Sequence, residues 1–192
     1  GRYLSSDEVP DGAVVTVTGT GAHPSSPIFL NGKSVRVEFA PDAAGELEVI
    51  VRGTKIEDDE RRAGKTAAFI TLKDGSLDVV NGLFRMSAAT VGTPAEWFVH
   101  ATDSDFAFRR SEIRGPVLPS KSIREMFRWE ASRGSTRRQR AVFEDSFVVT
   151  SCPLLVGSLR NRTVVVRNSV LAATDVLFDV DVTGFDPNLG VA

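Results

Sequence analysis

Hydrophobic and polar residues alternate along much of this chain, which is the pattern of a β-strand with one buried face. Val14–Thr18 is β-branched at every position, and this favours an extended backbone over a helix. Val35, Val37 and Phe39 alternate with polar residues, and further strands are expected at Leu47–Val51, Trp97–Ala101, Asp105–Arg109 and Val142–Thr150, and at Thr163–Arg167, a nearly continuous apolar run. We expect roughly eleven or twelve strands, at the spacing of a sandwich or a barrel.

Turn-forming dipeptides separate several of these strands. Asn31-Gly32, Asp74-Gly75 and Asn81-Gly82 all favour the type I′ turn of a two-residue hairpin. The last two predict that residues 67–87 form a three-stranded meander, and a turn at Pro41–Gly45 predicts that Val35–Phe39 pairs with Leu47–Val51. No sequence repeat with a period of 20–50 residues is visible. The pattern therefore predicts an all-β fold, an antiparallel β-sandwich or a jelly-roll-like barrel, with residues 1–192 in one domain.

One segment departs from this pattern. Ser122 and Glu125 have the spacing of a capping box at the start of a helix. The apolar residues after Ser122 follow a helical spacing, and Gly134 is a plausible C-terminal stop; these residues are Ile123, Met126, Phe127 and Ala131. One short helix is therefore expected inside an insert at about residues 110–140.

Charge is unevenly distributed along the chain. The whole chain has a net charge of −2, but Arg109–Arg140 contains ten Lys and Arg against three Glu, a net +7. Everything outside that stretch sums to −9. A basic insert on an acidic body can bind either a second copy of the chain or a polyanion. The sequence pI of about 5.8 weighs against a dedicated nucleic-acid-binding protein, because such domains are usually basic as a whole.

Composition narrows the function classes further. A hydrophobic fraction of 42% and a charged fraction of 25% are ordinary for a folded protein. No apolar run approaches the roughly 18 residues of a membrane span, and the first residues lack the apolar core of a signal peptide. Cys152 is the only cysteine, so no internal disulfide can form. A virion or the cytoplasm is the expected location.

Candidate catalytic groups are few. His23 and His100 are the only histidines, and neither has a neighbour at metal-ligand spacing. Cys152 lies before Pro153 in an apolar stretch, where it resembles a small buried hydrophobe more than a nucleophile. We therefore predict no enzyme activity, no cofactor and no metal site.

The basic insert carries the functional hypothesis. Its residues expected to contact a subunit or a nucleic acid are Arg124, Arg128, Arg133, Arg137, Arg138, Arg140 and Trp129, the last as a platform for a base. The first hypothesis is a structural protein that forms a homo-oligomer or repeating assembly, such as a viral or phage capsid, decoration or tail component. A small β-barrel that binds nucleic acid through the Arg109–Arg140 surface is the second. A ligand- or sugar-binding β-sandwich is the third.

Overall fold

The computed structural model describes residues 3–43, 47–51, 67–86, 95–116, 124–158 and 161–181. These residues form eighteen strands and no helix. The all-β class is therefore confirmed, but the strands lie in three parallel sheets of six, so the expected antiparallel sandwich or jelly-roll-like barrel is wrong. No helix in these ranges is long and apolar enough to span a membrane.

The three sheets share the strands equally. Sheet A contains β1 (Ala13–Val17), β4 (Ser34–Phe39), β7 (Ser76–Val80), β10 (Asp105–Arg109), β13 (Gln139–Glu144) and β16 (Arg162–Arg167). Sheet B contains β2 (Gly21–Ser25), β5 (Leu47–Val51), β8 (Leu83–Met86), β11 (Glu112–Arg114), β14 (Phe147–Thr150) and β17 (Val170–Ala173). Sheet C contains β3 (Ile28–Asn31), β6 (Ala68–Lys73), β9 (Trp97–Thr102), β12 (Glu125–Glu130), β15 (Leu155–Ser158) and β18 (Phe178–Asp181).

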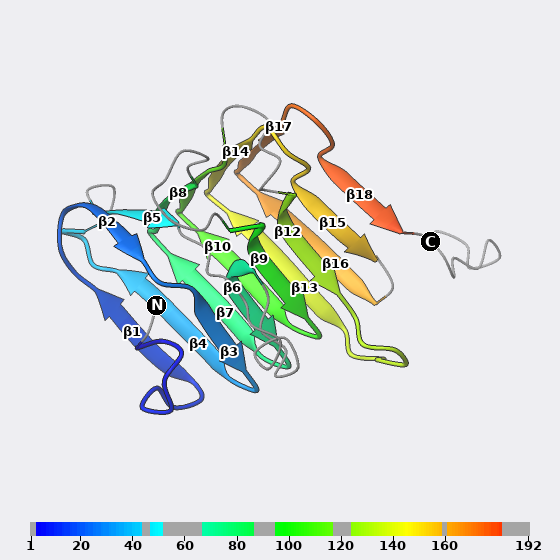
Figure 1. Ribbon diagram of the computed structural model, residues 1–192, viewed down its shortest axis with the longest axis horizontal. Coiled ribbons are helices and arrows are strands. Elements are labelled where there is room, and N and C mark those ends of the chain that lie inside the picture. The colour runs from blue at the N-terminus through cyan, green and yellow to red at the C-terminus, as the bar shows by residue number, and fades with distance from the viewer. Residues whose placement is uncertain are drawn as a thin grey trace.

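The chain visits sheets A, B and C in turn, and each circuit adds one strand to every sheet. Hydrogen-bonded neighbours are therefore always three elements apart in the chain. Figure 1 shows the circuits stacked side by side, from the blue strands near the N-terminus to the orange strands near the C-terminus. This arrangement is a parallel β-helix, and we number its circuits coil 1 (β1–β3) to coil 6 (β16–β18).

The coils differ in length. In sheet A, Ala13 aligns with Val35, Val35 with Leu77 and Leu77 with Phe106, which are steps of 22, 42 and 29 residues. The next two steps are 35 and 23 residues. The absence of a visible 20–50-residue repeat was thus misleading, because insertions of unequal length hide the structural repeat from a search for a fixed period.

The turn dipeptides mark corners between sheets instead of hairpins. Asp74 and Asn81 have positive φ angles of 55° and 61°, but the glycine that follows each does not. A type I′ turn needs positive φ at both central residues. One left-handed residue redirects the chain into the next sheet, so β6, β7 and β8 belong to three different sheets and form no meander. The expected pairing of Val35–Phe39 with Leu47–Val51 is also wrong, because β4 lies in sheet A and β5 lies in sheet B.

A ladder of serine hydroxyls supports the corners between sheets A and B. Each hydroxyl oxygen accepts the backbone N–H of the preceding coil at 2.9–3.1 Å, and the pairs are Gly82 with Ser111, Ser111 with Ser146 and Ser146 with Ser169. Each hydroxyl also donates to a carbonyl two residues earlier in its own coil. The ladder satisfies backbone groups that leave the sheet pattern at each corner.

The expected helix is a strand. Glu125–Glu130 forms β12, which pairs with β9 and β15 in sheet C; Ser122 and Ile123 lie outside the described residues. The strands β9 and β12 share one burial pattern, in which two consecutive buried residues precede an alternating pair. That buried doublet, Met126-Phe127 in β12, imitates helical spacing over a short segment. Periodicity in six residues cannot separate a strand from a helix.

The interior of the coils is filled by aromatic residues. Phe127 lies at the centre of this cluster, and its ring centroid is 5.2–5.8 Å from those of Phe98, Phe106, Phe108 and Phe143. These rings come from sheets A and C of three successive coils and are almost fully buried. Columns of aromatic side chains therefore hold neighbouring coils and neighbouring sheets together.

Candidate interaction surfaces

The most basic part of the predicted insert is the loop of residues 131–138 between β12 and β13. Arg133, Arg137 and Arg138 are all exposed on this loop. Arg137 forms an ion pair with Asp105 at 3.3 Å. No described residue forms an ion pair with Arg133 or Arg138, so the loop presents two cations to solvent.

Two aspartates of coil 4 anchor this loop at its base. Asp103 accepts the backbone N–H of Ser132 at 3.1 Å and the side-chain amide of Gln139 at 2.9 Å. Asp105 accepts the backbone N–H of Arg140 at 2.6 Å. Burial alone would raise the pKa of Asp103, but hydrogen bonds from Ser132, Ser135 and Gln139 outweigh it and lower the pKa. The loop is thus attached to the coil by charge-assisted hydrogen bonds at both of its ends.

The other residues of the predicted contact set lie elsewhere. Arg124 directly precedes β12 and pairs with Glu96, and Arg128 lies on the outer face of β12, where it pairs with Glu125 and Glu130. Trp129 points into the coil and is 1% exposed, and its Nε1 donates to the carbonyl of Ser104 at 3.0 Å. A base cannot stack on a side chain in that position. The seven residues do not form one surface, and their role in a contact remains a prediction.

Residues considered for catalysis are also separate in space. His23 lies on β2 and its Nε2 is 2.7 Å from the carbonyl oxygen of Thr20. His100 is on the outer face of sheet C, and Cys152 is buried, with burial raising the pKa of its thiol. Among the described residues, no group of three or more His, Cys, Asp or Glu is arranged to hold a metal ion.

His100 takes part in a polar network with Glu130. The His100 Nε2 lies 3.1 Å from one Glu130 oxygen, and Arg128 Nε donates to the other at 2.8 Å. The hydrogen bond with His100 is the main reason that the pKa of Glu130 falls from its ordinary 4.5 to about 2, against an opposing effect of burial. The folded structure therefore stabilises the charged form of the Glu130 carboxylate relative to the unfolded chain.

This network predicts a pH-dependent effect of Glu130→Gln. Because the folded-state pKa is lowered, the stabilisation is present above pH 4.5 and is lost as the pH falls towards 2. The side chain is 41% exposed, so solvent screening limits the loss at pH 7 to about 1 kcal/mol. Urea denaturation of both proteins at pH 7 and pH 2.5 measures it, with Glu8→Gln as an exposed control. Equal stability at pH 7 would contradict the prediction.

Charges on the outer face of sheet A are already compensated. Alternating ion pairs cross the strands from coil 2 to coil 6, in the order Glu38, Arg36, Asp78, Arg109, Glu144 and Arg167. Parallel strands in register place residues of equivalent position side by side, so like charges there would repel. Within this network, Arg109 is the one residue of the basic insert, and it pairs with Asp78 and Glu144 of the acidic remainder.

The two ends of the solenoid differ. At coil 1, the N-terminal segment places Leu4 and Val9 in the core, and the Ser5 hydroxyl accepts the Phe29 backbone N–H of β3 at 2.9 Å. At coil 6, no described residue pairs with the free edges of β16, β17 and β18. Three columns of core side chains end there at Val166, Leu171 and Phe178. Val166 is 45% exposed and Phe178 is 39% exposed.

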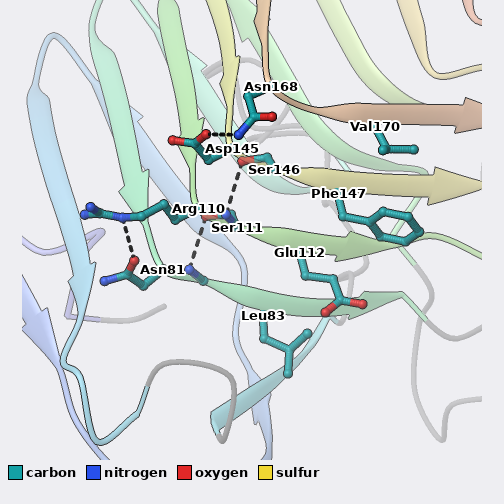
Figure 2. Close-up of a pocket in the computed structure, with 11 residues that line it drawn as sticks. Asn81, Leu83, Arg110, Ser111, Glu112, Asp145, Ser146, Phe147, Asn168 and Val170 are labelled. Atoms are coloured by element: carbon teal, nitrogen blue, oxygen red, sulfur yellow. Dashed lines mark hydrogen bonds between the residues drawn. The ribbon is translucent and has the colours of Figure 1, made fainter.

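A groove runs along the corner between sheets A and B (Figure 2). One wall is a ladder of left-handed corner residues, one from each of coils 3–6: Asn81, Arg110, Asp145 and Asn168. The other wall is formed by the outward residues that start the sheet B strands: Leu83, Glu112, Phe147 and Val170. The serine ladder and Gly82 form the floor, and the groove volume is about 360 Å³.

Contacts along the polar wall leave hydrogen-bonding capacity free. Arg110 Nε donates to the Asn81 side chain at 2.9 Å, and Asn168 donates to Asp145 at 2.7 Å. Asn and Asp adopt positive φ readily, but Arg does so rarely, at a cost of about 1 kcal/mol. Arg110 has a φ of 48° and forms no ion pair with any described residue. The sequence interpretation missed this groove. Its signal is a dipeptide that recurs at the ends of the sheet A strands, with Asn, Arg or Asp first and Gly or Ser second.

Comparisons with protein-family models, curated proteins and solved structures gave no match to this chain. Its function must therefore be inferred from its own residues. Among the described surfaces, the end of coil 6 offers strand edges without a described partner, and the corner groove offers polar groups that can still accept or donate hydrogen bonds.

Proposed function

We propose that the protein is a non-enzymatic structural module that self-associates through the end of coil 6, as a virus or phage capsid, decoration or tail component would. The observation that carries this proposal is that, on that end, no described residue pairs with the strand edges and apolar side chains are exposed. An unpaired edge is a template for another strand. Exposed core side chains add a hydrophobic gain to such a contact.

Charge favours one geometry for the contact. A two-fold axis perpendicular to the solenoid brings two coil 6 ends together with their strands antiparallel, and one sheet then pairs with its own copy. Arg167 ends β16, and its side chain is 65% exposed. Asp179 is the second residue of β18 and is also exposed. If β17 pairs with its own copy, β16 meets β18 of the partner, and Arg167 lies opposite an aspartate.

The two other axes are less favourable. An axis through β16 gives Arg167 no aspartate partner, because the residue opposite it would be Arg162, whose guanidinium hydrogen-bonds to Gln139 and to the carbonyl of Trp129. An axis through β18 places Asp179 of one copy close to Asp179 of the other. Like charges across adjacent strands destabilise the pairing. We therefore favour the dimer with β17 next to its own copy.

A charge exchange tests this contact. Light scattering on a sizing column should give twice the 20.7 kDa mass of one chain. Arg167→Glu and Asp179→Arg should each weaken dimerisation about tenfold or more, because each places like charges across the interface. The double variant should restore dimerisation, since it exchanges the two charges. Arg138→Glu, on the basic loop, is the matched control and should dimerise normally.

Three results would count against the proposal. A monomer at every protein concentration would overturn self-association. Weakened dimers without rescue in the double variant would reject the β17 axis and keep the end of coil 6 as the contact. Loss of dimers in Arg138→Glu, or a salt-sensitive complex with excess absorbance at 260 nm, would assign the assembly to the basic loop or to nucleic acid instead.

A further inference from the structure

The corner groove has a shape that suits a linear polymer. It follows the solenoid axis across four coils, and each coil contributes one polar and one outward side chain. Adjacent strands in a sheet are about 4.8 Å apart, so the side chains on each wall repeat at that distance. This spacing is close to the length of one hexose unit in an extended glycan. Each hexose unit of such a glycan would therefore meet one side chain from each wall.

One wall of the groove is polar and the other is largely apolar. A sugar ring likewise has polar hydroxyl groups and an apolar C–H face. The polar wall offers amide, guanidinium and carboxylate groups, which donate to and accept from neighbouring hydroxyls. The opposite wall offers Leu83, Phe147 and Val170, with Phe147 42% exposed and Val170 54% exposed. The C–H face of a hexose can pack on the Phe147 ring while its hydroxyls reach the polar wall.

Other polymers fit this groove less well. Its lining residues carry one positive charge, on Arg110, and two negative charges, on Glu112 and Asp145. A net charge of −1 opposes a nucleic acid or an acidic glycan. An extended peptide presents equivalent side chains about 6.8 Å apart, which does not match the coil spacing. A peptide that adds a strand needs a free sheet edge, and this groove lies over paired strands.

We propose that the corner groove is a binding site for a linear, neutral oligosaccharide of hexose units. Phe147 stacks on one sugar ring, and Arg110, Asp145 and Asn168 hydrogen-bond to its hydroxyls and to those of the next unit. The site shares only Asn168 and Val170 with the coil 6 end proposed for self-association, and its central residues, Arg110 and Phe147, belong to coils 4 and 5. It gives a role to an arginine at a corner where its backbone conformation is unfavourable.

The test is a titration of the full chain with three neutral hexasaccharides: cellohexaose, laminarihexaose and maltohexaose. Binding is followed by two-dimensional NMR of ¹⁵N-labelled protein. At least one of them should shift the amide signals of Asn81, Arg110, Asp145 and Asn168. Phe147→Ala should weaken that binding about tenfold or more, because the stacking surface is lost. Phe29→Ala, which removes a half-buried ring from the outer face of sheet C, should bind like the wild type.

A second variant separates binding from folding. Arg110→Asn replaces a residue strained at positive φ with one that tolerates it, so the melting temperature should stay the same or rise. The same change removes the guanidinium from the groove, so oligosaccharide binding should weaken several-fold. No binding of any of the three hexasaccharides at millimolar concentration would overturn the proposal. Tighter binding of hexagalacturonate, or wild-type affinity in Phe147→Ala, would do so as well.

Discussion

Replacing Phe127 with alanine should lower the free energy of unfolding by about 4 kcal/mol, because a large buried ring leaves a cavity. Phe127 is fully buried, and four other phenylalanine rings surround it. These rings come from coils 3, 4 and 5, so the cavity would weaken two coil-to-coil contacts together. The stability of a solenoid is approximately a sum of such neighbour contacts.

Phe147→Ala is the matched control for this prediction. It removes the same atoms from the outer face of sheet B, where the ring is 42% exposed. The expected cost is about 0.5 kcal/mol or less, as for other surface substitutions. Urea denaturation followed by circular dichroism measures both variants. Similar losses in the two variants would mean that the aromatic cluster is not the main contact between the coils.

The sequence predicted many individual strands but not their arrangement, and the expected eleven or twelve strands are fewer than the eighteen observed. Alternation at Val35, Val37 and Phe39 depends only on one face being buried, and that is true in a β-helix and in a sandwich alike. The partner of a strand is a non-local property. β4 pairs with β7, which lies 42 residues later, and no local signal distinguishes that pairing from a hairpin with β5.

The predicted contact set failed as a surface for a related reason. Arg128 and Trp129 are adjacent in sequence, but successive residues of a strand point to opposite faces. Arg128 is therefore on the outside of sheet C and Trp129 is inside the coil. A helical interpretation of the same residues placed both on one amphipathic surface. Arg133, Arg137 and Arg138 are exposed on the loop of residues 131–138, since an arginine-rich segment without periodicity favours a loop in either fold.

Gly75→Ala is the second substitution with a large expected effect, a loss of about 3 kcal/mol in the free energy of unfolding. Gly75 does not have a positive φ, so its conformation alone would accept alanine. A Cβ at this position would overlap the backbone of Lys33 in the preceding coil. Ser76 N–H donates to the Lys33 carbonyl at 3.0 Å, and relieving the overlap would lengthen that hydrogen bond.

Replacing Gly75 with asparagine distinguishes an overlap with the Lys33 backbone from a requirement for positive φ in a hairpin turn. In a type I′ hairpin the second central residue has positive φ, which asparagine tolerates, so Gly75→Asn would cost little. In the β-helix the obstacle is the neighbouring backbone, so Gly75→Asn should destabilise at least as much as Gly75→Ala.

Gly134 provides the reverse case, because its φ is 82° and a Cβ added there would have no atom within 4 Å. Gly134→Asn should be nearly neutral and Gly134→Ala should cost about 1 kcal/mol. Thermal unfolding of the four variants would therefore decide between a close approach of two coils and a hairpin at Asp74-Gly75.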